Sequence, residues 1–457
     1  MNKGKVYLIG AGPGDPGLLT CRAKQLLADC DVVCYDKLVS AAILSTIPEG
    51  VQLHQVGYLG YQGTHIDYGM HPDVLEFALA GKRVARLKAG DPCIFGRTTE
   101  ECRDLKSKGI PYEIVPGITA ALGAASYSGF PLTSGGVASS VTFVSGHKNT
   151  KALNSWSRLG PDGGTLVLYM GAKKLAEHTK SLIENGKSKD TPIALISSAT
   201  SADHGCITGT LETIADNVEK AGYRGPALVI IGEVVEQADE LDWRNQLPLT
   251  GVRMLTCGQY EELKALRNAG AEVIAVENMP VKSLIDSEDL EYLSSLSELS
   301  FSDLPSFKVW WRAVQENNWD IRKFPMPMGS NNRYVRNALS EIGIRPESVS
   351  DKAMTLTLSE EKAFGEKDKF YLAGRMDSEA QHYALPEVEW VLVENIAMFQ
   401  SIAQHHSESI QNAQLVPLNE EVKAWALANN YLADEWDIPD FVDISDLTES
   451  GERADVA

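Results

Sequence analysis

A glycine-rich loop at residues 10–17 follows a short apolar run and has the composition of a ligand-binding turn. Its first three glycines are spaced Gly-x-Gly-x-Gly, not the Gly-x-Gly-x-x-Gly of dinucleotide-binding loops. Pro13 and Pro16 have no N–H group, and Asp15 places a carboxylate where a pyrophosphate needs bare donors. The loop therefore disfavours a dinucleotide phosphate, while its glycines still allow close backbone approach. A tight turn without a ligand is the alternative.

Two further polar segments follow apolar runs. Asp36 comes directly after the run at 32–35, and residues 89–97, which include Gly-Asp-Pro and a terminal Gly-Arg, follow the run at 82–88. Ligands of parallel α/β sheets bind at the carboxyl ends of the strands. We therefore expect these segments and the glycine-rich loop to face one site.

The elements that must hold these loops follow from hydrophobic periodicity. Residues 5–36 predict a strand–loop–helix–strand unit, the first step of a parallel α/β sheet. A second block of strands begins near Ala138, and strand–helix–strand patterning restarts after a polar segment at 236–250. The sequence thus predicts an α/β protein with an N-terminal lobe at 1–118, a second lobe at 119–245 and a separate α/β domain at 250–457 that ends in an acidic tail.

The charge of the chain is uneven. Residues 1–250 contain 24 Lys+Arg and 26 Asp+Glu, whereas residues 251–457 contain 18 and 36. Nucleic-acid binding requires clustered positive charge, so no nucleic-acid partner is expected. No apolar run has transmembrane length and no signal-peptide pattern is present, so no membrane partner is expected either. Seven cysteines without a Cys-x-x-Cys pair indicate a reducing, cytoplasmic location and no metal site.

Seven motifs occur in order along residues 5–240, and together they closely resemble the uroporphyrinogen-III C-methyltransferases of the tetrapyrrole methylase family. The motifs lie at residues 10–17, 35–40, 90–97, 115–119, 138–147, 168–171 and 225–227. The glycine-rich loop alone would also suit other tetrapyrrole methylases. The segments Tyr-Asp-Lys-Leu-Val-Ser and Ala-Ser-Ser-Val-Thr-Phe-Val-Ser-Gly-His are the ones that look specific.

The resemblance implies a two-lobed homodimer that transfers two methyl groups from S-adenosyl-L-methionine (SAM) to C2 and C7 of uroporphyrinogen III. The products would be precorrin-2, on the route to siroheme and cobalamin, and S-adenosyl-L-homocysteine. The family's cofactor positions correspond here to Pro13, Ala89, Gly90, Asp91, Ile94, Thr119, Ala120, Met170, Ala199 and Ala227.

The same resemblance assigns substrate contact and proton handling to Asp36, Arg97 and Glu100. Arg97 could bind substrate carboxylates in bidentate fashion, and Glu100, three residues on, could face the same way from a helix start. Each has a plainer interpretation: Arg97 and Glu100 could form a surface ion pair, and Asp36 could cap the helix starting near Ser40. Met170 could be a core residue.

Three departures from the family pattern concern the substrate site. Residues 57–60 lack the usual basic pair, Ala89 replaces a glycine, and Thr98 with Thr99 replaces a glycine pair. The missing basic pair leaves open two alternatives to the uroporphyrinogen enzyme: a later precorrin or cobalt-precorrin methyltransferase, or a non-catalytic, SAM-responsive tetrapyrrole-binding scaffold. His147 could bind a carboxylate or lie in a solvated loop.

The C-terminal part resembles a degenerate uroporphyrinogen-III synthase domain. Residues 253–256 and 266–273 match that family's opening, but residues 301–307 replace its Phe-Thr-Ser motif and Asn332 stands where threonine is usual. Asp303 and the acidic balance oppose a polycarboxylate ligand. We therefore expect a domain without synthase activity.

Overall fold

The computed structural model describes residues 3–48, 50–56, 69–146, 163–223, 225–256, 263–276, 281–348, 350, 352–376 and 383–431. The chain forms two compact units, here called the N-terminal unit (Met1–Val252 with Arg267–Glu272) and the C-terminal unit (Arg253–Leu266 with Val273–Ala457). Both combine strands and helices, which confirms the expected α/β class. None of the helices in the described ranges is long and apolar enough to cross a membrane.

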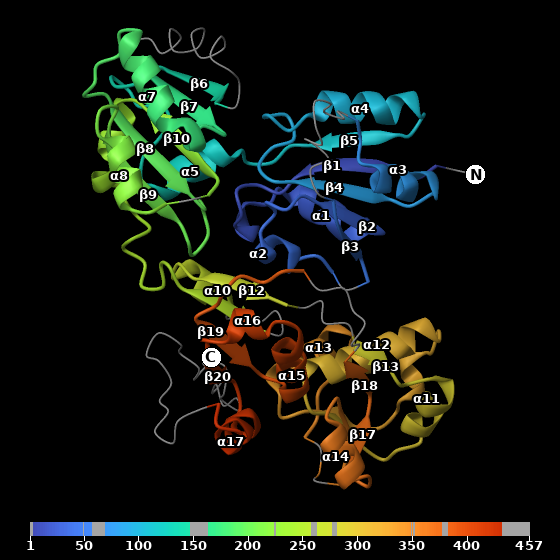
Figure 1. The fold of residues 1–457 in the computed structure, drawn as a ribbon. Coiled ribbons are helices and arrows are strands. Elements are labelled where there is room, and N and C mark those ends of the chain that lie inside the picture. The colour runs from blue at the N-terminus through green and yellow to red at the C-terminus, as the bar shows by residue number, and fades with distance from the viewer. Residues whose placement is uncertain are drawn as a thin grey trace, which may run out of the picture. The chain divides into compact units, whose positions relative to one another are not determined.

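The first sheet of the N-terminal unit is parallel and has the strand order β3-β2-β4-β1-β5 (Figure 1). Its strands are β1 (Val6–Gly10), β2 (Val32–Tyr35), β3 (Gln52–Gln55), β4 (Val84–Lys88) and β5 (Tyr112–Val115). The helices between them are α1 (Cys21–Asp29), α2 (Ala41–Leu44), α3 (Pro72–Leu79) and α4 (Thr98–Ser107). Because all five strands are parallel, the loops after β1, β2, β4 and β5 lie at one edge of the sheet.

Burial explains why the central strands read as continuous apolar runs. Every residue of β2 and β4 is buried, as expected for parallel strands covered on both faces. Helix α1 starts at Thr20, whose hydroxyl accepts a hydrogen bond from the N–H of Ala23, and it buries Ala23, Leu26 and Leu27. The result is a rigid layer that fixes the loops at the carboxyl edge.

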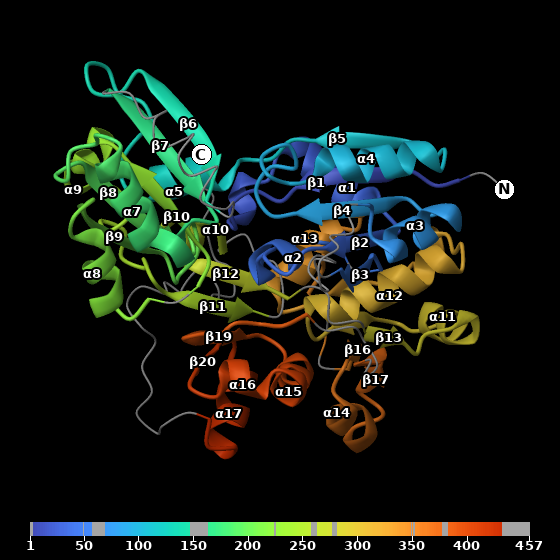
Figure 2. The same ribbon diagram turned by 45° about the horizontal axis from the view of Figure 1, so that its top comes forward.

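The second sheet has the order β6-β7-β10-β8-β9 (Figure 2). Only β6 and β7 pair in parallel; the other three pairs are antiparallel. The strands are β6 (Ser140–Ser145), β7 (Gly164–Tyr169), β8 (Pro192–Ser197), β9 (Gly205–Thr210) and β10 (Ala227–Ile231), and the main helices are α5 (Ala120–Tyr127), α7 (Leu175–Glu184) and α8 (Ile214–Lys220). Small residues of α5 (Ala121, Ala124 and Ala125) are buried in the core on one face of this sheet.

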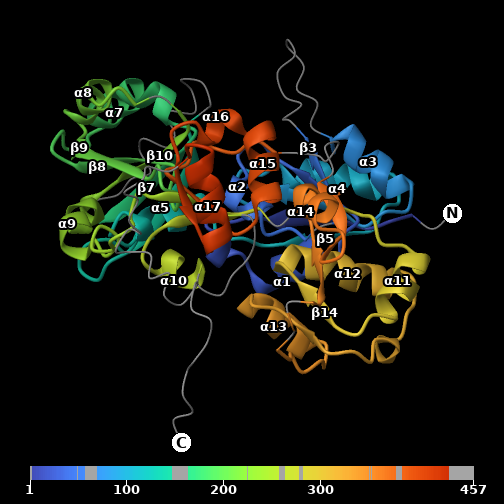
Figure 3. The ribbon, with the colours of Figure 1, turned by 90° about the horizontal axis from the view of Figure 1, so that it is seen from below.

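The C-terminal unit consists of two α/β lobes (Figure 3). The first lobe has the strand order β12-β11-β19-β20, with β11 (Arg253–Thr256), β12 (Glu272–Ala275), β19 (Trp390–Val393) and β20 (Gln414–Pro417), and helices α10 (Leu263–Asn268), α15 (Ile396–His405), α16 (Ser407–Ile410) and α17 (Glu420–Ala428).

The second lobe has the order β15-β14-β16-β17 and a core around the fully buried Trp310. Its strands are β14 (Leu299–Phe301), β15 (Met328–Gly329), β16 (Met354–Thr357) and β17 (Phe370–Leu372), and its helices are α11 (Ser287–Ser294), α12 (Leu304–Glu316), α13 (Arg333–Glu341) and α14 (Glu360–Gly365). A separate antiparallel pair is formed by β13 (Val281–Ser283) and β18 (Gly374–Met376).

Candidate functional site

A cavity of about 360 Å³ lies at the carboxyl ends of β2 and β4 in the N-terminal unit. Two of the three predicted catalytic residues, Asp36 and Arg97, line this cavity. It also contains three of the predicted cofactor positions, Ala89, Ile94 and Met170. Its other lining residues are Lys37, Leu38, Gly69, Met70, His71, Arg86, Lys88, Phe95, Gly96 and Glu101. The mixture of apolar and charged side chains suits an organic ligand with ionic groups.

Asp36 is held at the end of β2 by two hydrogen bonds. Its backbone N–H donates to the carbonyl of Leu87 over 3.1 Å, and its Oδ1 accepts a hydrogen bond from Nη2 of Arg86 over 2.5 Å. Helix α2 is capped instead by Ser40, whose hydroxyl accepts from the N–H of Ile43. The alternative in which Asp36 caps this helix is therefore wrong.

Three residues that line the cavity have a left-handed backbone conformation. The φ angles of Phe95, Arg97 and Met170 are +55°, +59° and +58°. Non-glycine residues adopt this conformation at a cost and concentrate at functional sites. Met170 is also 53% exposed, so its interpretation as a core residue is wrong. Phe95 packs against Tyr169, with 5.0 Å between ring centroids.

Glu100 does not line this cavity. It lies in a neighbouring open depression together with Arg103, Asp104 and Lys108. The carboxylate that lines the cavity with Asp36 belongs to the next residue, Glu101, which is buried in the first turn of α4.

Sequence reasoning missed Glu101 and its two partners, Arg86 and Lys88. All three are buried, and Lys88 Nζ contacts both carboxylate oxygens of Glu101, at 2.8 and 2.9 Å. Burial lowers the pKa of Lys88, and repulsion by Arg86 adds to this. The sequence did contain a signal for these partners. Arg86 and Lys88 stand at alternate positions of an otherwise apolar strand, and buried charges require partners of opposite charge.

The loops after β1 and β4 are interlocked through glycine backbone. Gly12 and Gly90, with φ angles of +73° and +72°, exchange hydrogen bonds of 2.8 and 3.1 Å. A Cβ on Gly10 would lie 2.6 Å from the backbone nitrogen of Gly117, so glycine is required at this crossing. The predicted cofactor residue Asp91 connects the loop after β4 with the loop after β5, because its Oδ2 accepts a hydrogen bond from the N–H of Gly117.

Of the remaining predicted cofactor residues, Pro13, Thr119 and Ala120 lie where the two lobes of the N-terminal unit meet. Thr119 precedes α5, which begins at Ala120, and its Oγ1 lies 2.6 Å from the hydroxyl oxygen of Tyr169 in the second lobe. Pro13 packs so closely on α5 that a Cβ on Gly123 would lie 2.5 Å from it.

On the second lobe, Ala227 is paired with Ser197, two residues before Ala199. The next residue, Thr200, accepts a hydrogen bond from the backbone N–H of Asp15 over 3.0 Å. These contacts connect Ala199 to the glycine-rich loop.

The carboxylate of Asp15 has partners within the protein. It accepts hydrogen bonds from the N–H of Gly17 over 2.7 Å and from the hydroxyl of Tyr127 over 2.6 Å. The loop therefore surrounds a carboxylate, which disfavours the binding of a phosphate.

Residues 57–60 and His147, which the sequence singled out, lie outside the described residues. In the described ranges no group of three His, Cys, Asp or Glu side chains could hold a metal ion.

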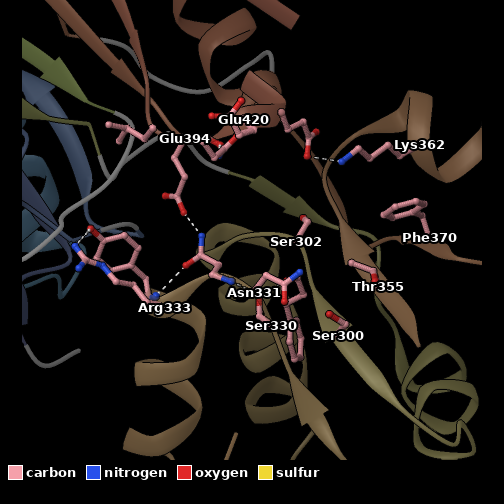
Figure 4. Close-up of a pocket in the computed structure, with 16 residues that line it drawn as sticks. Ser300, Ser302, Ser330, Asn331, Arg333, Thr355, Lys362, Phe370, Glu394 and Glu420 are labelled. Carbon is pink, nitrogen blue, oxygen red and sulfur yellow. Dashed lines mark hydrogen bonds and ion pairs between the residues drawn. The ribbon is translucent and has the colours of Figure 1, made fainter. Parts of the chain in front are cut away.

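A second cavity, of about 690 Å³, lies between the two lobes of the C-terminal unit. Figure 4 shows the hydroxyl residues Ser300, Ser302 and Thr355 on one side and Glu394 and Glu420 on the other. Its lining also includes Ser330, Asn331, Asn332, Arg333, Lys362, Phe370, Asn419 and Glu421. The cavity is thus polar, with three carboxylates and two cations.

Four helices that begin at this inter-lobe region are capped by their own side chains. Asp303, Asn332, Asn395 and Asn419 each accept hydrogen bonds from N–H groups in the first turn of α12, α13, α15 and α17. These N–H groups are the ones that would otherwise bind an anion.

Three polar contacts also join the two lobes across this region. Asn395 donates to Asp303 over 2.5 Å, Asn332 donates to Glu394, and Lys362 lies 2.5 Å from Glu421. The polar groups around the cavity are therefore largely engaged with one another.

Comparison with known proteins identifies the N-terminal unit. Residues 5–215 match the family described as Tetrapyrrole (Corrin/Porphyrin) Methylases. Siroheme synthase of Acinetobacter baylyi is 45% identical over 242 residues, which are 53% of this chain and 53% of that protein. Siroheme synthase of Methylobacillus flagellatus is 41% identical over 244 residues, 53% of this chain and 52% of that protein. The chain thus spans about half the length of the curated relatives it matches.

A solved structure, uroporphyrin-III C-methyl transferase from Thermus thermophilus complexed with S-adenyl homocysteine, is 37% identical. The match covers 51% of this chain and 99% of that one, with a TM-score of 0.44. The family match covers most of both lobes of the N-terminal unit and includes the cavity residues from Asp36 to Met170. By this match, residues 5–215 of the N-terminal unit form a tetrapyrrole methylase domain.

Proposed function

We propose that the N-terminal unit transfers methyl groups from SAM to carbon atoms of uroporphyrinogen III, at C2 and C7, and so produces precorrin-2. The observation that carries this proposal is the cavity that brings Asp36, Arg97 and Met170 together at the carboxyl ends of the strands. The siroheme synthases that match residues of the same unit support a tetrapyrrole as the substrate.

The chemistry of the loops fits SAM better than a phosphorylated cofactor. SAM carries no phosphate, and in the glycine-rich loop the N–H of Gly17 binds the carboxylate of Asp15. The backbone crossing of Gly10, Gly90 and Gly117 adjoins the end of β4, which is followed by the apolar cavity residues Ala89 and Ile94. When bound, SAM supplies an electrophilic methyl group on a sulfonium.

The residues of the chain have two tasks in such a reaction. They must align the pyrrole carbon with the methyl group, an effect of proximity and orientation, and they must accept the proton that the methylated carbon system loses. We assign proton transfer to Asp36, which lies at the cavity with 28% of its side chain exposed. Arg97 is the candidate to bind substrate carboxylates. Glu100, the third residue that the resemblance assigns, stays a candidate in the neighbouring depression.

Incubation of the purified chain with SAM and enzymatically prepared uroporphyrinogen III tests the proposal. S-adenosyl-L-homocysteine and the absorbance of precorrin-2 are the expected products. Their absence would refute the substrate assignment. Methylation of precorrin-2 but not of uroporphyrinogen III would select a later precorrin methyltransferase, the alternative that the missing basic pair at 57–60 favours. SAM binding without turnover on any tetrapyrrole would favour the scaffold.

We further propose that the C-terminal unit is a degenerate uroporphyrinogen-III synthase-like domain without ring-closing activity. The two-lobed α/β architecture supports the kinship. The side-chain caps and the three carboxylates of the cavity oppose a polycarboxylate substrate, because both the N–H donors and the positive charges already have partners. Hydroxymethylbilane added without SAM should give no type III isomer above the spontaneous background. Ring closure to the type III isomer would overturn this assignment.

A homodimer and a cytoplasmic location complete the proposal. The family resemblance motivates the dimer, and the cysteine usage motivates the reducing compartment. Light scattering coupled to gel filtration measures the first, where a mass near 49.8 kDa would contradict a dimer. Cell fractionation measures the second.

A further inference from the structure

Two cations on β4 belong to a charge network in the wall of the cavity. Arg86 and Lys88 are two residues apart in the strand, so their side chains lie on the same face of the sheet. Each residue is 6% exposed, although β4 lies in the middle of a buried parallel sheet. Charges buried to this degree are retained only where partners compensate them.

The compensating groups are two carboxylates that alternate with the cations. Lys88 Nζ binds both oxygens of Glu101, Arg86 Nε lies 3.5 Å from Oε1 of Glu101, and Arg86 Nη2 lies 2.5 Å from Oδ1 of Asp36. The order is therefore Lys88, Glu101, Arg86, Asp36, with two positive and two negative groups. A third contact, from Nη1 of Arg86 to the carbonyl of Leu87 over 3.2 Å, fixes the plane of the guanidinium.

All four residues line the cavity, and Asp36 is the most exposed of them. The side chains of Arg86, Lys88 and Glu101 are 7 to 8% exposed, whereas that of Asp36 is 28% exposed. Within the described residues, Oδ1 of Asp36 accepts a hydrogen bond from Arg86, and Oδ2 accepts none. The orientation of Oδ2 toward a ligand thus depends on the position of Arg86. Glu101 attracts Arg86 from the other side as an ion pair, at 3.5 Å from a buried Nε that forms no hydrogen bond with a described residue.

We propose that Glu101 is a positioning residue that, through Arg86, fixes the carboxylate of Asp36 for proton transfer, while Lys88 neutralises Glu101. This inference rests on the methyltransferase function proposed above. It gives Glu101 a part in catalysis, whereas the family resemblance assigns substrate contact and proton handling to the neighbouring residue Glu100. Loss of Glu101 would release Arg86 and let the Asp36 carboxylate turn, which affects the chemical step more than ligand binding.

The test compares E101Q with two other variants of the full chain. E101Q should lower kcat by about 30-fold or more, since small misplacements of a catalytic group have effects of this order, while the SAM Kd and the KM change less than threefold. The matched control is E113Q, because Glu113 also bridges two cations, Lys5 at 2.8 Å and Arg22 at 2.9 Å, but lies on β5 away from the cavity. It should keep kcat within twofold of the wild type.

The double variant K88M/E101Q separates positioning from stability. E101Q leaves Lys88 buried without its partner and should lower Tm, whereas K88M/E101Q removes both charges and should recover much of that loss. Positioning predicts that kcat stays low in the double variant although Tm recovers.

Two results would overturn the inference: E101Q with wild-type kcat, or kcat that recovers together with Tm in K88M/E101Q. A wild-type chain that methylates no tetrapyrrole gives a different pattern, since it refutes the proposed function itself.

Discussion

The substitution of Asp36 by asparagine isolates the proposed proton transfer from the binding of either substrate. Asparagine has the shape of aspartate, and its amide oxygen can still accept the hydrogen bond from Nη2 of Arg86. Only the charge and the capacity to take up a proton are lost. Arg86 keeps Glu101 at 3.5 Å and the carbonyl of Leu87 at 3.2 Å, so we expect the unfolding free energy to fall by only about 1 kcal/mol.

The expected effect on catalysis is much larger than the effect on stability. A positioned general base contributes about 10² to 10⁴ in rate, so kcat for D36N should fall by roughly 100-fold or more. The SAM Kd should stay within twofold, because the predicted cofactor residues Gly90, Asp91 and Thr119 follow β4 and β5, whereas Asp36 follows β2. Single-turnover formation of S-adenosyl-L-homocysteine measures the first quantity and isothermal titration calorimetry the second.

Asp31 provides the matched control at the other end of the same strand pair. It precedes β2, and its carboxylate pairs with Arg83, which precedes β4, at 3.3 Å. D31N removes a carboxylate–arginine pair of the same kind from an exposed position, so kcat should stay within twofold. If D36N kept its rate within threefold of the wild type, the acid–base role of Asp36 would be wrong. An equal loss in D31N and D36N would mean that a general effect on the sheet had been measured.

Three further predictions concern the helix start, the glycine crossing and acid stability. E100Q should lower kcat less than E101Q does, because Glu101 lines the cavity and Glu100 does not; the reverse order, measured as kcat at saturating substrate, would restore the assignment to Glu100. G117A should destabilise the N-terminal unit by about 2–3 kcal/mol in urea unfolding, because its Cβ would lie 2.5 Å from the carbonyl oxygen of Gly90; an unchanged midpoint would mean that the crossing can relax. Burial lowers the pKa of His204 from 6.5 to about 4, so the unfolded chain binds a proton that the folded chain does not between these pH values. The free energy of unfolding is therefore unaffected by His204 above pH 6.5 and decreases as the pH falls toward 4. The decrease should be about 2 kcal/mol once the partial exposure of the side chain is allowed for. H204Q should flatten that part of the pH–stability curve.

The first sheet and the location of its site could be predicted because the relevant signals are local. The apolar run at 32–35 ends at Asp36, and the run at 82–88 ends at the Gly-Asp-Pro segment, so the strands and their carboxyl ends are visible in the sequence. The parallel order then brings those ends to one edge. That Asp36 and Arg97 line one cavity follows from this edge and needs no knowledge of side-chain contacts.

Which of the two neighbouring glutamates lines the cavity could not be predicted in the same way. The expectation that Arg97 and Glu100 share a face applied the i, i+3 rule of helices, but Arg97 has a φ of +59° and stands before the first helical residue, Thr98. The rule therefore does not relate these two side chains. The side chains of successive helical residues point about 100° apart around the helix axis. Glu100 and Glu101 therefore face different depressions although they are neighbours in the sequence. A left-handed residue before a helix follows from tertiary packing and leaves no clear local signal.

The two cavities differ in how their polar groups are used, and this difference supports different roles for the two units. In the N-terminal unit the charges of the network pair with one another, and Asp36 is its most exposed member at the cavity. In the C-terminal unit the caps of α13 and α17 and the pair of Lys362 with Glu421 satisfy the groups that could bind an anion. A ligand there would have to replace hydrogen bonds that the protein already makes, which costs the free energy of those contacts. A partly exposed carboxylate can support chemistry, and the internal pairing of the second cavity supports the proposal that its polar groups mainly stabilise the contact between the two lobes of the C-terminal unit.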